Sequence, residues 1–108
     1  GKGYLSCVEA YNIKENKWRT LKNKMPTKRE GCAVVSTKDK KILVIGGFNG
    51  SRLDCVEMLD LETETWSKLP SMKRQRSGCC AGVIGDYVLV VGGYNGNDSL
   101  ASAELFCL

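Results

Sequence analysis

The fold is decided by a stretch that the sequence contains twice, first as Lys41-Ile42-Leu43-Val44-Ile45-Gly46-Gly47-Phe48-Asn49-Gly50 and again as Asp86-Tyr87-Val88-Leu89-Val90-Val91-Gly92-Gly93-Tyr94-Asn95-Gly96. Each copy is a short apolar run, rich in β-branched residues, that ends at two glycines followed by an aromatic residue and Asn-Gly. An apolar run of this length between turn residues predicts a strand that is buried on both faces. Paired glycines allow positive φ and close backbone packing, and Asn-Gly favours a tight turn.

Other landmarks repeat at nearly the same interval. The spacing is 46 residues from Gly46 to Gly92, 48 from Trp18 to Trp66 and 47 from Arg29 to Arg76. Periods of about 20 to 50 residues are typical of solenoids, propellers and other repeat arrays. The pattern predicts strands at 5–13, 17–21, 31–37, 41–47, 53–61, 64–69, 78–84, 87–93 and 100–108.

The repeat unit has a recognisable order. Gly-Gly, an aromatic residue and Asn-Gly are followed by Leu-x-x-x-Glu, a Trp nine residues after the Glu, a Met six or seven residues later and an Arg four residues after that. This order resembles the kelch repeat over essentially the whole chain. The resemblance implies an all-β fold, a partial kelch-type β-propeller of about two and a quarter four-stranded antiparallel blades.

The resemblance also divides the chain. Within a partial kelch propeller of residues 1–108, we expect the end of one blade at 1–21, a complete blade at 31–69 and three strands of a further blade at 78–108. With the strands of a blade lettered A to D from the central channel outward, the chain reads C–D, A–B–C–D, A–B–C. Propellers close with roughly four to eight blades. We therefore expect the propeller to be completed by further repeats of a longer parent chain or by self-association.

The composition excludes several classes of function. The 108 residues contain no histidine, so neither a Ser-His-Asp triad nor a Cys-His pair is available, and we expect no enzyme activity. Four of the six cysteines recur with the repeat, as Cys7 with Cys55 and Cys32 with Cys79, and no Cys-x-x-Cys pair occurs, which argues against a zinc site or other cofactor. We expect them to be small, reduced packing residues in a cytoplasmic protein. No run approaches the ~20 apolar residues of a membrane span, and aromatic residues are too sparse for a nucleic-acid stacking platform.

Two sets of recurring residues have a structural interpretation. Trp18 and Trp66 lie within predicted strands, so we expect them to pack one blade against the next. A Glu recurs at Glu9, Glu57 and Glu104. A carboxylate inside a strand is expected to accept hydrogen bonds from backbone N–H groups or from an arginine.

Charge is concentrated at one end of the predicted blades. The B–C and D–A connections carry eight basic residues and three acidic ones, a net charge of +5, whereas charges at the A–B and C–D turns cancel. A solvated charged rim would explain this distribution. The alternative is a recognition face that attracts an acidic protein or peptide partner.

The family resemblance points to the same end of the blades. BTB-kelch proteins, the adaptors of cullin-type ubiquitin ligases, bind peptide segments with these connections. The contact positions implied here are Arg29, Glu30, Phe48, Arg52, Arg76, Ser77, Tyr94 and Ser99. For Arg52 and Arg76 the alternative is a structural role, in which they bond carbonyls inside the blade. The expected function is therefore a protein–protein interaction module of the substrate-adaptor type, and the alternative is an actin-associated kelch scaffold. Glu30 departs from the small or polar residue often found at its position.

Overall fold

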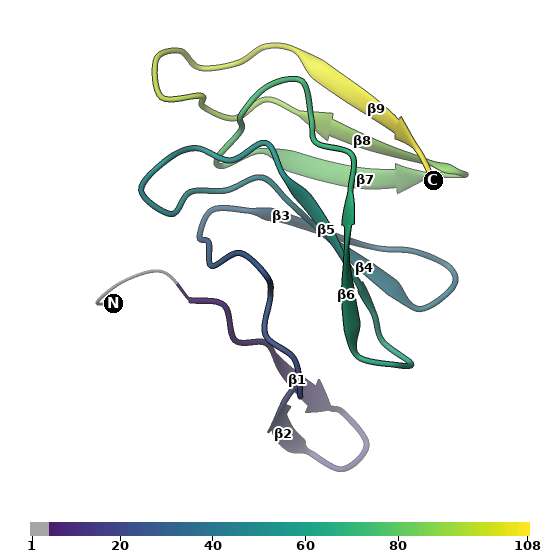
Figure 1. The fold of residues 1–108 in the computed structure, drawn as a ribbon. Helices are drawn as coiled ribbons and strands as arrows, with labels where there is room; N and C mark the ends of the chain where they lie inside the picture. The colour runs from purple at the N-terminus through teal and green to yellow at the C-terminus, as the bar shows by residue number, and fades with distance from the viewer. Residues whose placement is uncertain (1–4) are drawn as a thin grey trace.

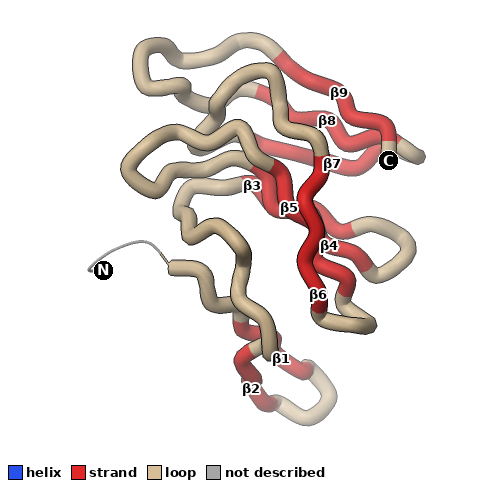
Figure 2. Tube along the Cα trace, in the orientation of Figure 1, coloured by secondary structure: helices blue, strands red, loops and turns tan. Residues whose placement is uncertain are grey.

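A computed structural model describes residues 5–108 as nine strands in three antiparallel sheets (Figures 1 and 2). The first sheet pairs β1 (Glu9–Asn12) with β2 (Lys17–Thr20). The second runs in the order β3 (Ala33–Ser36), β4 (Lys41–Ile45), β5 (Val56–Asp60), β6 (Thr65–Leu69), and the third in the order β7 (Cys80–Ile84), β8 (Tyr87–Val91), β9 (Ala103–Cys107). The predicted all-β fold is confirmed, although every strand is shorter than its predicted range. The first four residues of the predicted segment 1–21 lie outside the described residues.

The core lies between the second and third sheets. Leu43, Ile45 and Val56 of the second sheet pack with Val88 and Val90 of the third, and all five side chains are buried. The two inner strands lie side by side, since the N–H of Gly78 donates to the carbonyl of Gly31 over 2.8 Å just before β7 and β3 begin. The first strands of the second and third sheets, β3 and β7, are therefore neighbours.

The prediction that both glycine-terminated strands are buried on both faces is correct for β4 and wrong for β8. In β4, Leu43 and Val44 point to opposite faces and are both buried. In β8, Val88 and Val90 are buried, but Tyr87 and Val91 on the other face are 46% and 39% exposed. The physical reason is that the third sheet covers one face of β4, and the connection before β3, whose Thr27 and Arg29 bond Glu57, covers the other. No sheet lies against the exposed face of β8 among residues 5–108.

The glycine pairs have the conformation that the sequence predicts. Gly47 and Gly93 have φ values of +110° and +96°. A Cβ atom on Gly47 would lie 2.7 Å from the carbonyl oxygen of Glu30, and one on Gly93 would lie 2.8 Å from that of Ser77. Because these glycines have no Cβ atom, the ends of β4 and β8 can pass directly against the connections that precede β3 and β7.

The two tryptophans differ in their surroundings. Trp66 is half-buried, and its Nε1–H donates to the carbonyl of Asn23 over 3.2 Å. This bond joins β6 to the connection between β2 and β3. Trp18 is 67% exposed and contacts the ring of Tyr11 at a centroid distance of 5.1 Å. The prediction that Trp18 packs between blades is therefore wrong in this structure. The sequence contains no earlier repeat to supply a contact like that of Asn23.

The connections sort to two ends of the sheets, as expected for meandering blades. In Figure 1 the long loops after β2, β4, β6 and β8 lie at one end, and the short turns after β1, β3, β5 and β7 lie at the other. None of the described residues forms a helix, let alone one long and apolar enough to cross a membrane.

The six cysteines are free thiols. Cys79 is buried, and burial raises the pKa of its thiol above the usual value. Cys32 and Cys55 are half-buried, as a packing role requires. Cys7 is exposed, so the prediction that it packs as Cys55 does is wrong here; its blade has only two strands in this chain.

Candidate functional site

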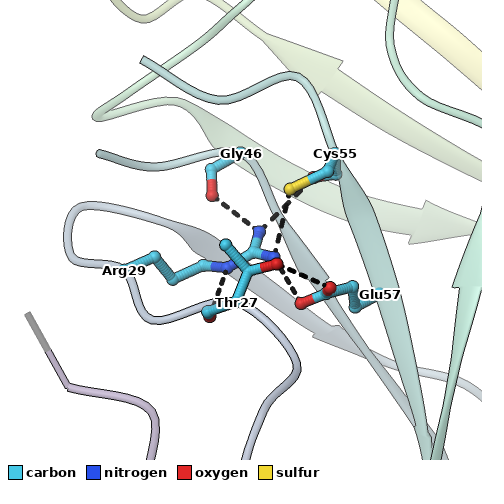
Figure 3. Close-up of polar contacts among 5 residues, drawn as sticks. All are labelled: Thr27, Arg29, Gly46, Cys55 and Glu57. Atoms are coloured by element: carbon cyan, nitrogen blue, oxygen red, sulfur yellow. Dashed lines mark hydrogen bonds and ion pairs between the residues drawn. The ribbon is translucent and has the colours of Figure 1, made fainter. Parts of the chain in front are cut away.

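The arginine of each D–A connection is buried under the loops. The guanidinium of Arg29 donates to the carbonyl of Gly46 over 2.8 Å, to the thiol of Cys55 over 3.2 Å and to the carboxylate of Glu57 (Figure 3). The hydroxyl of Thr27 donates to the other oxygen of Glu57 over 2.9 Å. The side chains of Arg29 and Glu57 are 0% and 1% exposed, so this is a fully desolvated ion pair with several hydrogen-bond partners.

The same arrangement recurs one repeat later. Arg76, also 0% exposed, donates to the carbonyls of Gly92 and Ser102 over 2.8 and 2.9 Å and to the carboxylate of Glu104 over 3.1 Å. Glu104 also accepts from the backbone N–H of Lys73 over 2.7 Å. Burial alone would raise the pKa of Glu104, but the Lys73 N–H and the Arg76 guanidinium outweigh it and hold the pKa below its usual value.

These two networks change the interpretation of two predicted contact residues. Arg29 and Arg76 are not exposed contact residues in this structure, because their donors bind carbonyls and a strand carboxylate within the blade. For Arg76 this is the structural alternative that the sequence left open. The expectation that Glu57 and Glu104 accept from an arginine or backbone N–H groups is confirmed. Within the described residues Glu9 forms no such bond; the other two carboxylates each pair with an arginine 28 residues earlier, a position that the sequence does not include for Glu9.

The networks also involve residues that the sequence did not indicate. Cys55 and Ser102 occupy the same repeat position, and each accepts from the Nη2 group of its arginine, over 3.2 and 2.9 Å. The sequence could have indicated this role, because Cys and Ser replace each other at one repeat position and both side chains can accept a hydrogen bond. Thr27 offered no signal, because the second repeat has Arg74 at the equivalent position.

The other six predicted contact residues form two backbone-linked triplets. In each triplet the aromatic residue after Gly-Gly makes β-bridges to a D–A residue on one side and a B–C residue on the other. The first triplet is Glu30, Phe48 and Arg52, and the second is Ser77, Tyr94 and Ser99. These residues are exposed or half-buried, in contrast to the arginines beneath them.

Arg52 joins the two triplets. Its guanidinium carbon lies 4.2 Å from the ring centroid of Phe48 and 4.9 Å from that of Tyr94, so the cation is held by two aromatic rings from successive blades. Its Nε–H donates to the hydroxyl of Ser77 over 3.2 Å, and that hydroxyl donates to the carbonyl of Tyr94 over 3.2 Å. Within residues 5–108 the terminal Nη groups of Arg52 have no hydrogen-bond partner. A planar cation fixed in this way can offer its two Nη groups to a carboxylate.

The loops around Arg52 are basic. Lys28, Lys73 and Arg74 are exposed on the D–A connections, and Glu30 is the exposed acidic member of the first triplet. The described part of the chain contains no group of three or more His, Cys, Asp or Glu residues that could hold a metal ion. These loops therefore form a positively charged surface on which the guanidinium of Arg52 is held between two rings.

Comparison with known proteins identifies relatives over the whole repeat pattern. A family model described as the KLHDC2/KLHL20/DRC7 Kelch-repeats domain matches residues 1–106. A RING finger domain and kelch repeat-containing protein of Dictyostelium discoideum is 32% identical over 100% of this chain and 11% of its own length. Kelch domain-containing protein 8B of Bos taurus is 40% identical over 100% of this chain and 34% of its own. A putative F-box/kelch-repeat protein of Arabidopsis thaliana is 39% identical over 69% of this chain and 20% of its own. The chain thus spans between 11% and 34% of the length of these relatives.

Proposed function

This chain belongs to the kelch-repeat family, whose repeats generally serve as protein-interaction modules without enzymatic activity, and from that premise we propose that it is the substrate-recognition section of a ubiquitin-ligase adaptor. In this proposal the parent protein is of the BTB-kelch type and acts with a cullin-type ligase. Relatives whose names join kelch repeats to a RING finger or an F-box support the ligase context. The six free thiols agree with the cytoplasmic location that we propose.

The binding surface in this proposal is the pair of triplets, and its ligand is an extended peptide with an acidic side chain. The observation that carries the proposal is the position of Arg52, stacked by Phe48 and Tyr94 and oriented by Ser77. Because the two rings and the Ser77 hydroxyl hold the guanidinium, little conformational entropy is lost when a carboxylate binds it. The basic D–A loops would add long-range attraction that depends on salt.

The experiment separates a specific site from general attraction. A random peptide library displayed on phage is selected against the 108-residue chain, and the affinities of the selected peptides are measured for single-residue variants. Arg52→Ala should weaken binding at least about tenfold, in the range of a charge pair cut at an interface. Arg52→Lys should restore only part of the affinity, because an ammonium cannot stack and fork as a guanidinium does.

The matched control is Lys40→Ala, which removes the same charge from the A–B turn at the opposite end. Lys40 is 71% exposed in a 3.7 Å pair with Glu62. Its removal should leave affinity almost unchanged. Equal losses for Arg52→Ala and Lys40→Ala that track ionic strength alone would contradict the recognition site. The ligase context is tested separately, by co-precipitation of a cullin with the full-length parent protein.

A further inference from the structure

Glu30 lies on the same face of the first triplet as Arg52. Glu30 forms a β-bridge with Phe48, and Phe48 forms a second one with Arg52, so the three residues are neighbours across a small antiparallel ladder. Side chains of residues that lie directly opposite each other in such a ladder project to the same face. The guanidinium of Arg52 marks this face, because it lies over the ring of Phe48 at 4.2 Å. The side chain of Glu30 therefore belongs to the exposed surface that holds Arg52.

Backbone hydrogen bonds set the spacing of these two charged residues. The N–H of Glu30 donates to the carbonyl of Phe48 over 2.9 Å, and the N–H of Phe48 donates to the carbonyl of Glu30 over 2.8 Å, so this is a hydrogen-bonded pair. On the other side of Phe48 the flanking residues form the hydrogen bonds, over 2.9 and 3.1 Å, so Phe48 and Arg52 are a non-hydrogen-bonded pair. Pairs of these two kinds have Cα separations of about 5.5 Å and about 4.5 Å, which places Glu30 and Arg52 about 10 Å apart.

The guanidinium of Arg52 and the carboxylate of Glu30 do not pair with each other. Arg52 is turned toward the following blade, where its Nε–H donates to Ser77 and its guanidinium contacts the ring of Tyr94. Within residues 5–108 no Lys or Arg forms an ion pair with Glu30. One repeat earlier, the sequence position that matches Arg52 is Tyr4, which carries no charge. The surface thus offers a ligand one cation and one anion.

We propose that the peptide ligand has mixed charge, with a Lys or Arg two to four positions from the acidic residue that binds Arg52. The inference rests on the proposed function, because Arg52 must hold the acidic side chain. An extended chain advances about 3.3 Å per residue, so residues two to four positions apart are separated by roughly 7–13 Å, a range that contains the Glu30–Arg52 spacing. The Nη groups of Arg52 donate to the ligand carboxylate, and the carboxylate of Glu30 accepts from the ligand ammonium or guanidinium.

Glu30 also acts against ligands that carry acidic residues alone. The basic loops attract any acidic peptide through long-range charge, whatever its sequence. A second acidic residue placed beside Glu30 would bring two carboxylates together, and like charges side by side at an interface lower affinity. Glu30 is the acidic residue of the two triplets, and its equivalent in the second triplet is the uncharged Ser77. The discrimination between mixed-charge and uniformly acidic peptides is therefore assigned to the first triplet.

Selection of a random peptide library on phage tests the proposal, with wild type, Glu30→Gln and Glu30→Lys forms of the 108-residue chain run in parallel. In the sequenced wild-type pool, Lys and Arg should be enriched at least about threefold within four positions of an Asp or Glu, as expected for one exposed charge pair. The Glu30→Gln pool should keep the acidic residues and lose the basic ones, and the Glu30→Lys pool should replace the basic residues with acidic ones. Glu62→Gln is the matched control, because Glu62 is 69% exposed on the C–D turn at the opposite end.

A synthetic peptide from the wild-type pool gives a second measurement, which needs no variant protein to fold. Replacing the basic residue of this peptide by Ala should weaken its binding to the wild-type chain about two- to fivefold. The same replacement should leave binding to Glu30→Gln unchanged, because the partner of the basic residue is already absent.

The outcomes separate this inference from the proposed function. If Arg52→Ala selects the same acidic peptides as the wild type, or if the wild type selects no acidic peptide, the proposed function fails and this inference fails with it. If the selected acidic peptides depend on Arg52 but carry no excess of Lys or Arg, only this inference fails. Unchanged basic enrichment with Glu30→Gln, or an equal loss with Glu62→Gln, likewise overturns the selectivity assigned to Glu30 and leaves the Arg52 site standing.

Discussion

Replacing Gly47 by alanine should destabilise the chain far more than replacing Gly50, although both glycines have a φ of +110°. Each alanine pays the strain of that backbone conformation, on the order of 1–3 kcal/mol. Only at Gly47 does the new Cβ also meet the backbone, 2.7 Å from the carbonyl oxygen of Glu30, whereas nothing lies within 4 Å of it at Gly50. Overpacking adds about 1–3 kcal/mol, so we expect a total of about 2–6 kcal/mol for Gly47→Ala.

The assay is urea unfolding followed by circular dichroism, at one fixed protein concentration because association changes apparent stability. The second repeat offers an independent pair. Gly93 has a φ of +96° and a Cβ contact of 2.8 Å with the carbonyl oxygen of Ser77, and Gly96 has a φ of +100° with nothing within 4 Å. Equal losses of unfolding free energy within each pair would refute the close-packing argument and leave only backbone strain.

Three further predictions concern the buried charges and the tryptophans. Arg29→Ala leaves Glu57 buried without its cation and should lower the free energy of unfolding in urea by about 3–5 kcal/mol. Removal of an exposed charge such as Lys40 should lower it by less than about 1 kcal/mol. Trp66→Ala should lower the free energy of unfolding by less than loss of a fully buried tryptophan does, which is about 3–5 kcal/mol. Trp18→Ala in the unassociated chain should lower it by less than about 1 kcal/mol. Similar losses for the two variants would contradict their different burial. Glu104 has a folded pKa below its ordinary value of 4.5, so its contribution to stability is present above pH 4.5 and is lost as the pH falls through the lower folded pKa. Glu104→Gln should therefore flatten the acid limb of a plot of unfolding free energy against pH, and an unchanged limb would rule out this linkage.

The repeat in the sequence was sufficient to predict the strands and the general position of the connections. Side-chain alternation and turn residues are local properties, and their recurrence at Gly46 and Gly92 showed that the same local structure is formed twice. The grouping of Phe48 with Arg52, and of Tyr94 with Ser99, was also predictable, because each pair lies within one B–C connection.

Only the tertiary structure decided which way the arginines point. Arg29, Arg52 and Arg76 all lie in connections of the same basic end, and composition does not distinguish them. Arg29 and Arg76 turn inward because carbonyls and a strand carboxylate from the following blade complete their hydrogen bonds, whereas Arg52 stays at the surface between two rings. A long side chain takes its direction from partners that are distant in sequence, and a repeat specifies those partners only where the neighbouring blade is present. Trp18 and Trp66 show the same limit, since equal positions in the repeat have unequal burial when the neighbouring connection differs.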